Sequence, residues 1–98
     1  MAEEQPRALR LAETVRGRVA IVTGGATGLG RATALEFAQQ GVAVAFNYVD
    51  LPGRDVAAQA LLTETAIRGQ GVPVLCARCD VRNHDEVELF VTRARERL

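Results

Sequence analysis

The feature that most constrains this chain is a group of glycines placed directly after a short apolar segment. Residues 19–22 read Val-Ala-Ile-Val, a run typical of a strand buried on both faces of a parallel sheet. Four glycines follow within eight residues: Gly24, Gly25, Gly28 and Gly30. Apolar residues then recur at helical spacing over residues 29–40, and Gly41 stands where the helix would stop. The segment therefore predicts a strand, a glycine turn and a helix whose N-terminus faces an anion such as phosphate.

The same alternation is repeated twice along the chain. Apolar runs at residues 42–47 and 72–77 predict two further strands, and residues 54–67 predict a helix between them. Asn83 followed by Glu86 has the spacing of a capping box at the start of a last helix. Alternating strands and helices favour an α/β fold. We expect a Rossmann-type doubly wound parallel sheet of about three β-α units in spatial order 3-2-1, truncated before a next strand.

Two separated motifs resemble the short-chain dehydrogenase/reductase family. The family's turn reads T-G-x-x-x-G-x-G, and its Asp-Val pair after the third strand is matched by Asp80 and Val81. The turn is matched by Thr23, Gly24, Gly28 and Gly30. The resemblance covers about residues 17–98 and implies the N-terminal half of an NAD(P)-binding Rossmann domain, preceded by a flexible leader at residues 1–16. Within the family, residues 42–48 are most similar to the 3-oxoacyl-[acyl-carrier-protein] reductase group.

The resemblance implies a dinucleotide site at the glycine turn and at the ends of the second and third strands. Gly24 lets the chain leave the strand sharply, Gly28 lets backbone approach the pyrophosphate, and Gly30 permits close helix packing. Asp80 is implied to accept a hydrogen bond from the adenine amine; the alternative is a plain turn or capping residue. The expected cofactor-binding residues are Thr23, Gly24, Thr27, Gly28, Leu29, Gly30, Asn47, Tyr48, Arg54, Asp80 and Val81.

Residues at the end of the second strand favour NADP(H) over NAD(H). Asn47 and Tyr48 stand where an NAD-preferring site carries an acidic side chain, which would repel the 2′-phosphate of NADP. Asp50 either turns back toward the ribose or initiates the following turn. Arg54 and Arg31 are the cations placed to grip a 2′-phosphate, and the alternative for each is an ordinary surface charge.

Hydride transfer in the family depends on a Ser, a Tyr and a Lys three residues after the Tyr. All twelve basic residues of this chain are Arg, and its one Tyr, Tyr48, belongs to the adenosine end. The resemblance thus implies an oxidoreductase acting between NADP(H) and a carbonyl or alcohol, but the 98 residues alone are expected to be inactive, with the substrate site in a C-terminal half. The alternatives are a non-catalytic dinucleotide-binding module and half of a split enzyme.

Two further motifs suggest chemistry less strongly. Cys76 and Cys79 form a C-x-x-C pair, but a zinc site would need two more ligands, and residues three apart in a strand point to opposite faces. His84, the one histidine, stands beside the predicted helix cap without a nearby nucleophile. We expect both cysteines and His84 to be structural, and neither a metal site nor a catalytic residue.

Composition restricts the partners. The formal net charge is zero, which argues against nucleic acid, and the charged N-terminal segment is neither a signal peptide nor a membrane span. Two cysteines fit a reducing compartment, so we expect a cytoplasmic protein. If the strands that normally cover the first strand lie outside the chain, its exposed sheet edge favours self-association.

Overall fold

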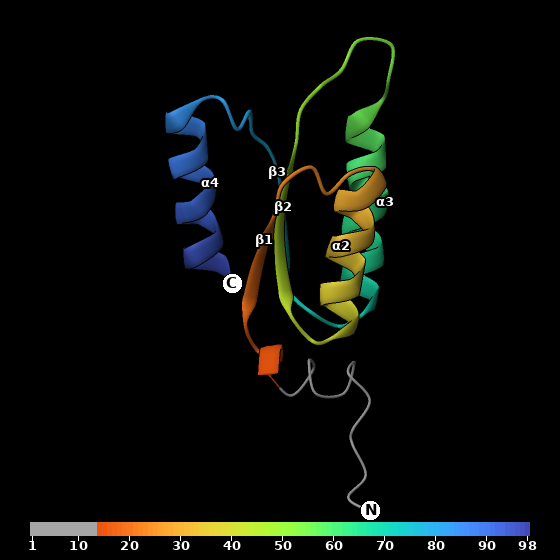
Figure 1. Ribbon diagram of the computed structural model, residues 1–98, viewed down its shortest axis with the longest axis vertical. Helices are drawn as coiled ribbons and strands as arrows, with labels where there is room; N and C mark the ends of the chain where they lie inside the picture. The colour runs from red at the N-terminus through yellow and green to blue at the C-terminus, as the bar shows by residue number, and fades with distance from the viewer. Residues whose placement is uncertain (1–13) are drawn as a thin grey trace, which may run out of the picture.

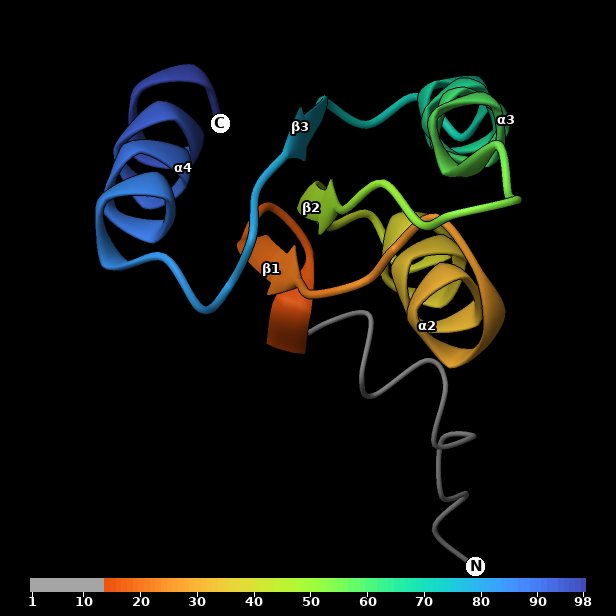
Figure 2. The same ribbon diagram turned by 90° about the horizontal axis from the view of Figure 1, so that it is seen from above.

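The computed structural model describes residues 14–98, which form a three-stranded parallel sheet between two layers of helices (Figures 1 and 2). The elements are β1 (Val19–Val22), α2 (Gly28–Gln39), β2 (Ala43–Tyr48), α3 (Val56–Gly69), β3 (Val74–Arg78) and α4 (His84–Arg97). Helices α2 and α3 lie on one face of the sheet and α4 on the other, as Figure 2 shows. The predicted doubly wound α/β fold is confirmed; of the predicted leader, residues 1–13 lie outside the described part.

The sheet has the order β1-β2-β3, which is the predicted order 3-2-1 read from its other edge. Val22 of β1 is in register with Phe46 of β2, and Tyr48 of β2 is in register with Arg78 of β3. The carboxyl ends of the three parallel strands therefore meet at one edge of the sheet. The loops that follow the strands gather at this carboxyl end of the sheet, which in open α/β sheets is where ligands bind.

Alternate residues of the central strand β2 supply two cores. Val44 and Phe46 pack in the core under α2 and α3, whereas Ala45 packs in the core under α4. All three side chains are fully buried. This alternation follows from the two-residue period of a strand, and it explains why residues 42–46 form an unbroken apolar run.

Strand β1 is more exposed than its sequence predicts. Val19 and Ile21 are 45% and 47% exposed, so the expectation that β1 is buried on both faces is wrong. The reason is position: β1 is an edge strand, and α4 packs mainly against β3. An apolar run shows what a strand can bury and does not show whether a neighbour covers it.

Glycine and capping residues set the helix ends. Gly41 follows α2 with a φ of +82°, confirming its predicted role as a stop. Helix α3 starts at Val56, two residues later than predicted, because Arg54 forms an isolated bridge with Leu51 and Asp55 caps the helix by accepting from the Ala58 amide.

The capping box predicted at the start of α4 is half formed. Asn83 accepts from the Glu86 amide at 3.1 Å, as expected. The Glu86 carboxylate, however, accepts from the backbone N–H of Asp80 at 3.3 Å rather than from Asn83. Glu86 therefore joins α4 to the loop after β3.

Candidate cofactor-binding site

The glycine turn between β1 and α2 uses two glycines for their backbone conformation. Gly24 has a φ of +70° and Gly28 a φ of +56°, backbone angles that residues with a Cβ rarely adopt. Thr27 is the N-cap residue of α2, but its side chain makes no capping hydrogen bond, and the first turn of the helix holds no acidic residue. The first N–H groups of α2 therefore face the turn uncapped by a side chain, and such groups bind anions.

Two other glycines are required by close packing. A Cβ on Gly30 would overlap the carbonyl group of Gly24, so the turn folds directly against the first turn of α2. The sequence predicts that Gly30 lets the helix pack closely on the sheet. In the structure, the atoms that Gly30 approaches most closely belong to the glycine turn. A Cβ on Gly25 would overlap the side chain of Phe46. The sequence gives no signal for Gly25 beyond its place beside Gly24, because the contact is made across the sheet.

Asn47, at the end of β2, holds both neighbouring loops. Its Oδ1 accepts from the Gly24 N–H at 2.9 Å, and its Nδ2 donates to the Cys79 carbonyl at 2.8 Å. The residue is only 4% exposed. Sequence position places Asn47 at the cofactor ribose, but both polar groups of its side chain bind protein backbone.

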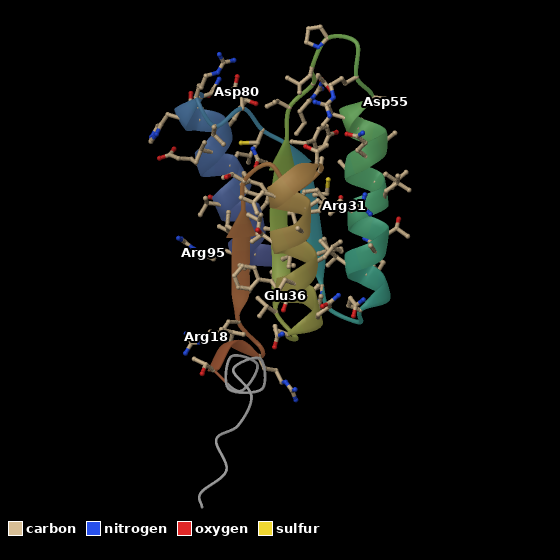
Figure 3. The ribbon with its side chains drawn as sticks, turned by 45° about the vertical axis from the view of Figure 1, so that its right-hand side comes forward. Arg18, Arg31, Glu36, Asp55, Asp80 and Arg95 are labelled. Atoms are coloured by element: carbon tan, nitrogen blue, oxygen red, sulfur yellow. The ribbon has the colours of Figure 1, made fainter. Side chains whose placement is uncertain are left out.

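Asp80 follows β3 and is held by its own loop. Its carboxylate accepts from the Arg82 backbone N–H at 2.9 Å and from the Arg82 guanidinium at 2.8–3.3 Å. These hydrogen bonds from Arg82 lower the pKa of Asp80 from 3.8 to about 2. Figure 3 shows Asp80 at the end of the molecule opposite Arg18, where the carboxyl ends of the strands meet.

An open pocket of about 510 Å³ lies between these loops. It brings together six of the predicted residues: Thr23, Gly24, Asn47, Tyr48, Asp80 and Val81. Val49, Leu51 and Arg82 also line it and were not predicted, because nothing in their local sequence marks them. Thr27, Gly28, Leu29 and Gly30 lie in the turn and in the start of α2, outside the pocket lining. Arg54 lies in the loop after β2 and is likewise not part of the lining.

Asp50 lies beside the pocket, between Val49 and Leu51 of its lining. Its carboxylate forms an ion pair with the guanidinium of Arg78 at the end of β3. The ion pair links the loop after β2 to β3.

The two cysteines and His84 do not line this pocket. Cys76 packs against the core under α2 and α3, and Cys79 lies in the core under α4, so the pair faces opposite sides of the sheet. Burial raises the pKa of the Cys76 thiol to about 11 and also raises the pKa of Cys79. His84 is exposed, with its Nε2 3.1 Å from a Glu88 carboxylate oxygen on the next helical turn. Residues 14–98 hold no group of three or more side chains that could bind a metal ion.

A parallel sheet with a glycine turn against a helix N-terminus and a pocket at the strand ends defines a Rossmann-type nucleotide-binding protein. Residues 18–98 match the family described as short chain dehydrogenase. The chain belongs to this oxidoreductase family, whose members bind NAD(P).

Individual relatives agree with this assignment. Levodione reductase of Leifsonia aquatica is 39% identical over 80 residues, which cover 82% of this chain and 28% of the relative. The 3-oxoacyl-[acyl-carrier-protein] reductase FabG of Staphylococcus aureus is 36% identical over 72 residues, 74% of this chain and 27% of the relative. A solved dehydrogenase/reductase of Sinorhizobium meliloti superposes with a TM-score of 0.74 at 32% identity, covering 84% of this chain and 31% of that one. The chain spans about a third of the length of such relatives.

No helix within residues 14–98 has the length and apolar character needed to cross a membrane.

Proposed function

We propose that this chain binds the adenosine and pyrophosphate part of a nicotinamide dinucleotide, within an oxidoreductase that transfers a hydride between NADP(H) and a carbonyl or alcohol substrate. The observation that carries the proposal is the pocket formed where the glycine turn, the end of β2 and the loop after β3 meet. Its volume of about 510 Å³ falls within the range of small-molecule sites, roughly 300–1,000 Å³.

The residues present fit both parts of such a ligand. Val49, Leu51 and Val81 line the pocket and are 37–56% exposed, which offers apolar surface to a flat base. At the turn, a Cβ on Gly28 would meet no atom within 4 Å, so the backbone there is open to an approaching phosphate. The N-terminus of α2 carries a positive partial charge of about half an elementary charge toward that phosphate.

The charges around the pocket support NADP(H) over NAD(H). Asp80 is the one carboxylate that lines the pocket, and it is paired with Arg82. Asp50, in the loop after β2, is paired with Arg78, and the carboxylate of Glu86 accepts from the backbone N–H of Asp80. The carboxylates of Asp80 and Asp50 are each neutralised by an arginine, which reduces their repulsion of a 2′-phosphate, and Arg54 in the adjacent loop adds a further positive charge.

The catalytic step is proposed to require residues outside this chain. The chain has no Lys, and Tyr48 lines the adenosine pocket. The Ser, Tyr and Lys that perform the family's chemistry, and the substrate site, would therefore be supplied by further polypeptide, and these 98 residues alone would not oxidise NADPH.

The cysteines Cys76 and Cys79, unpaired in the structure, fit a cytoplasmic location.

The binding proposal is tested by titrating the 98-residue chain with NADPH and with NADH in a calorimeter, beside the variants Gly30→Ala and Gly69→Ala. Gly30→Ala places a Cβ against the Gly24 carbonyl and is expected to weaken NADPH binding by at least about tenfold, about 1.4 kcal/mol. Gly69→Ala meets no atom within 4 Å, lies at the end of α3 and is expected to bind like the unchanged chain. Circular dichroism verifies that each protein is folded.

The affinities decide two separate questions. Tighter binding of NADPH than of NADH supports the cofactor preference, and the reverse order contradicts it. If a folded chain binds neither dinucleotide, or if Gly30→Ala binds as well as Gly69→Ala, the proposed site is wrong.

A further inference from the structure

Asn47 occupies a position from which one side chain reaches both loops of the pocket. β2 is the central strand, so the glycine turn after β1 lies on one side of its end and the loop after β3 on the other. The amide of Asn47 spans this gap, accepting from Gly24 and donating to Cys79 at 2.9 and 2.8 Å. The residue after Cys79 is Asp80, the start of the segment that lines the pocket.

Backbone hydrogen bonds reinforce the same connection. The Gly25 N–H donates to the Asn47 carbonyl at 3.1 Å, and the Cys79 N–H donates to the Tyr48 carbonyl at 3.0 Å. Within residues 14–98, the amide of Asn47 is the only side-chain group that forms hydrogen bonds with both of these loops. Removing it would leave each loop tied to β2 but no longer tied to the other.

We infer that Asn47 is a positioning residue that fixes the separation of the phosphate turn and the adenine loop, and thereby sets the affinity for the dinucleotide. The inference rests on the proposed function, since it assumes that this pocket holds the cofactor. Asn47 need not touch the cofactor to have this effect. It acts through the Gly24 N–H and the Cys79 carbonyl.

The chemistry of the site explains why an amide is required. The group must accept on one side, donate on the other and carry no charge at 4% exposure. An ionised Asp keeps the acceptor for Gly24 but has no proton for the Cys79 carbonyl. A protonated Asp offers both an acceptor and a donor, so it reproduces the bonds of Asn. Ser is too short to span both loops at any pH.

The variant Asn47→Asp therefore gives a test that depends on pH. NADPH affinity is measured by calorimetry between pH 5 and 8 for the chain, for Asn47→Asp and for the control Asn83→Asp, and each variant is compared with the unchanged chain at the same pH. Asn83 is an exposed helix cap that only accepts a hydrogen bond, a role that Asp also fills. We expect Asn47→Asp to bind about tenfold more weakly at pH 8 and to recover most of this loss at pH 5, because burial raises the pKa of the new carboxyl. Asn83→Asp is expected to match the unchanged chain throughout.

Other titrating groups near Asn47 do not produce this pattern. Asp80, with a pKa of about 2, stays ionised over the whole range, and its partner Arg82 stays charged. The Cys79 thiol stays neutral because burial raises its pKa. His84 and Glu86 from α4 are present in all the proteins, so their contribution cancels in the comparison.

A second variant and a ligand-free measurement keep the inference separable from the proposed function. Asn47→Ser, which introduces no charge, is expected to bind about tenfold more weakly at every pH and carries the test if Asn47→Asp does not fold at pH 8. Hydrogen exchange of the Gly24 amide, followed by NMR without ligand, is expected to be faster in Asn47→Ser. Affinity of Asn47→Ser equal to that of the unchanged chain, or a deficit of Asn47→Asp that is the same at pH 5 and 8, overturns the inference. If the unchanged chain binds no dinucleotide, the proposed function fails. In that case, equal exchange rates of the Gly24 amide in Asn47→Ser and in the unchanged chain would overturn the positioning role as well.

Discussion

At the scale of single residues, the carboxylate of Asp80 shows how local contacts stabilise a charged group at this site. Arg82, two residues later, binds it through both the backbone and the guanidinium. A folded-state pKa of about 2, below the ordinary 3.8, means that the ionised form is stabilised by folding. The contribution is therefore present at pH values above about 4 and is lost as the pH falls toward 2.

This linkage predicts how Asp80→Asn changes stability with pH. At pH 6 the variant should unfold at a lower urea concentration than the unchanged chain, because its neutral amide binds the Arg82 guanidinium less strongly. At pH 2, where the Asp80 carboxyl becomes protonated, the two midpoints should approach each other. Urea unfolding followed by circular dichroism at both pH values measures the difference, and other carboxyl groups cancel because both proteins contain them. A midpoint difference that is equal at pH 6 and pH 2 would show that the Arg82 contact does not stabilise the fold.

Residues at the site differ in how far their roles could be predicted from sequence. The role of Gly24 was predictable because a sharp turn depends on a local backbone conformation, which glycine alone adopts readily, whereas the positive φ of Gly28 was not predicted. Gly25 leaves room for the side chain of Phe46 on the neighbouring strand. Asn47 binds Gly24 and Cys79, which lie 23 and 32 positions away from it along the chain. Which residues meet across a sheet depends on register, and the sequence gives no register until the strands are paired.

At the scale of elements, α3 contacts the glycine turn through a buried hydrogen bond. Its Thr63 is fully buried, with Oγ1 3.4 Å from the Ala26 carbonyl in the turn and 3.2 Å from the Gln59 carbonyl. Helix α3 also packs against α2, which begins at the turn. The order of strands and helices was predictable from hydrophobic periodicity. The start of α3 was not, because it depends on the bridge between Leu51 and Arg54.

The N-cap of α3 is expected to contribute measurably to stability. Asp55→Ala removes the acceptor for the Ala58 amide, which lies 3.0 Å from the carboxylate, and should lower the free energy of unfolding by about 1 kcal/mol. For a chain of this size, such a change lowers the melting temperature by about 4–8 °C. Asp55→Asn keeps an acceptor and should melt close to the unchanged chain. Thermal melting of the three proteins makes the comparison, and equal losses in both variants would mean that charge, rather than the capping bond, is responsible.

At the scale of the whole molecule, the sheet formed by residues 14–98 has two edge strands, β1 and β3, and the two edges differ in character. A groove lies beside the edge strand β1. It is lined by Val19 and Ile21 of β1, by Val91, Ala94 and Arg95 of α4, and by Leu98, which follows α4. β3, at the other edge, carries Arg78 with its ion pair to Asp50. A charged edge resists pairing with another chain, whereas an apolar edge with free backbone groups favours it.

The exposed β1 edge therefore predicts that the 98-residue chain self-associates as its concentration rises, with β1 of one copy against β1 of another. Ile21→Lys places a charge on this edge, where the side chain is 47% exposed, and should shift the chain toward monomer in sedimentation velocity runs over a concentration series. Leu62→Lys is the matched control, because it replaces a 60% exposed apolar side chain on the outside of α3. If association is driven by general apolar exposure, the two variants will reduce it alike. A reduction confined to Ile21→Lys locates the contact at β1, and since the cofactor pocket lies at the carboxyl ends of the strands, NADPH binding by that monomer should be retained.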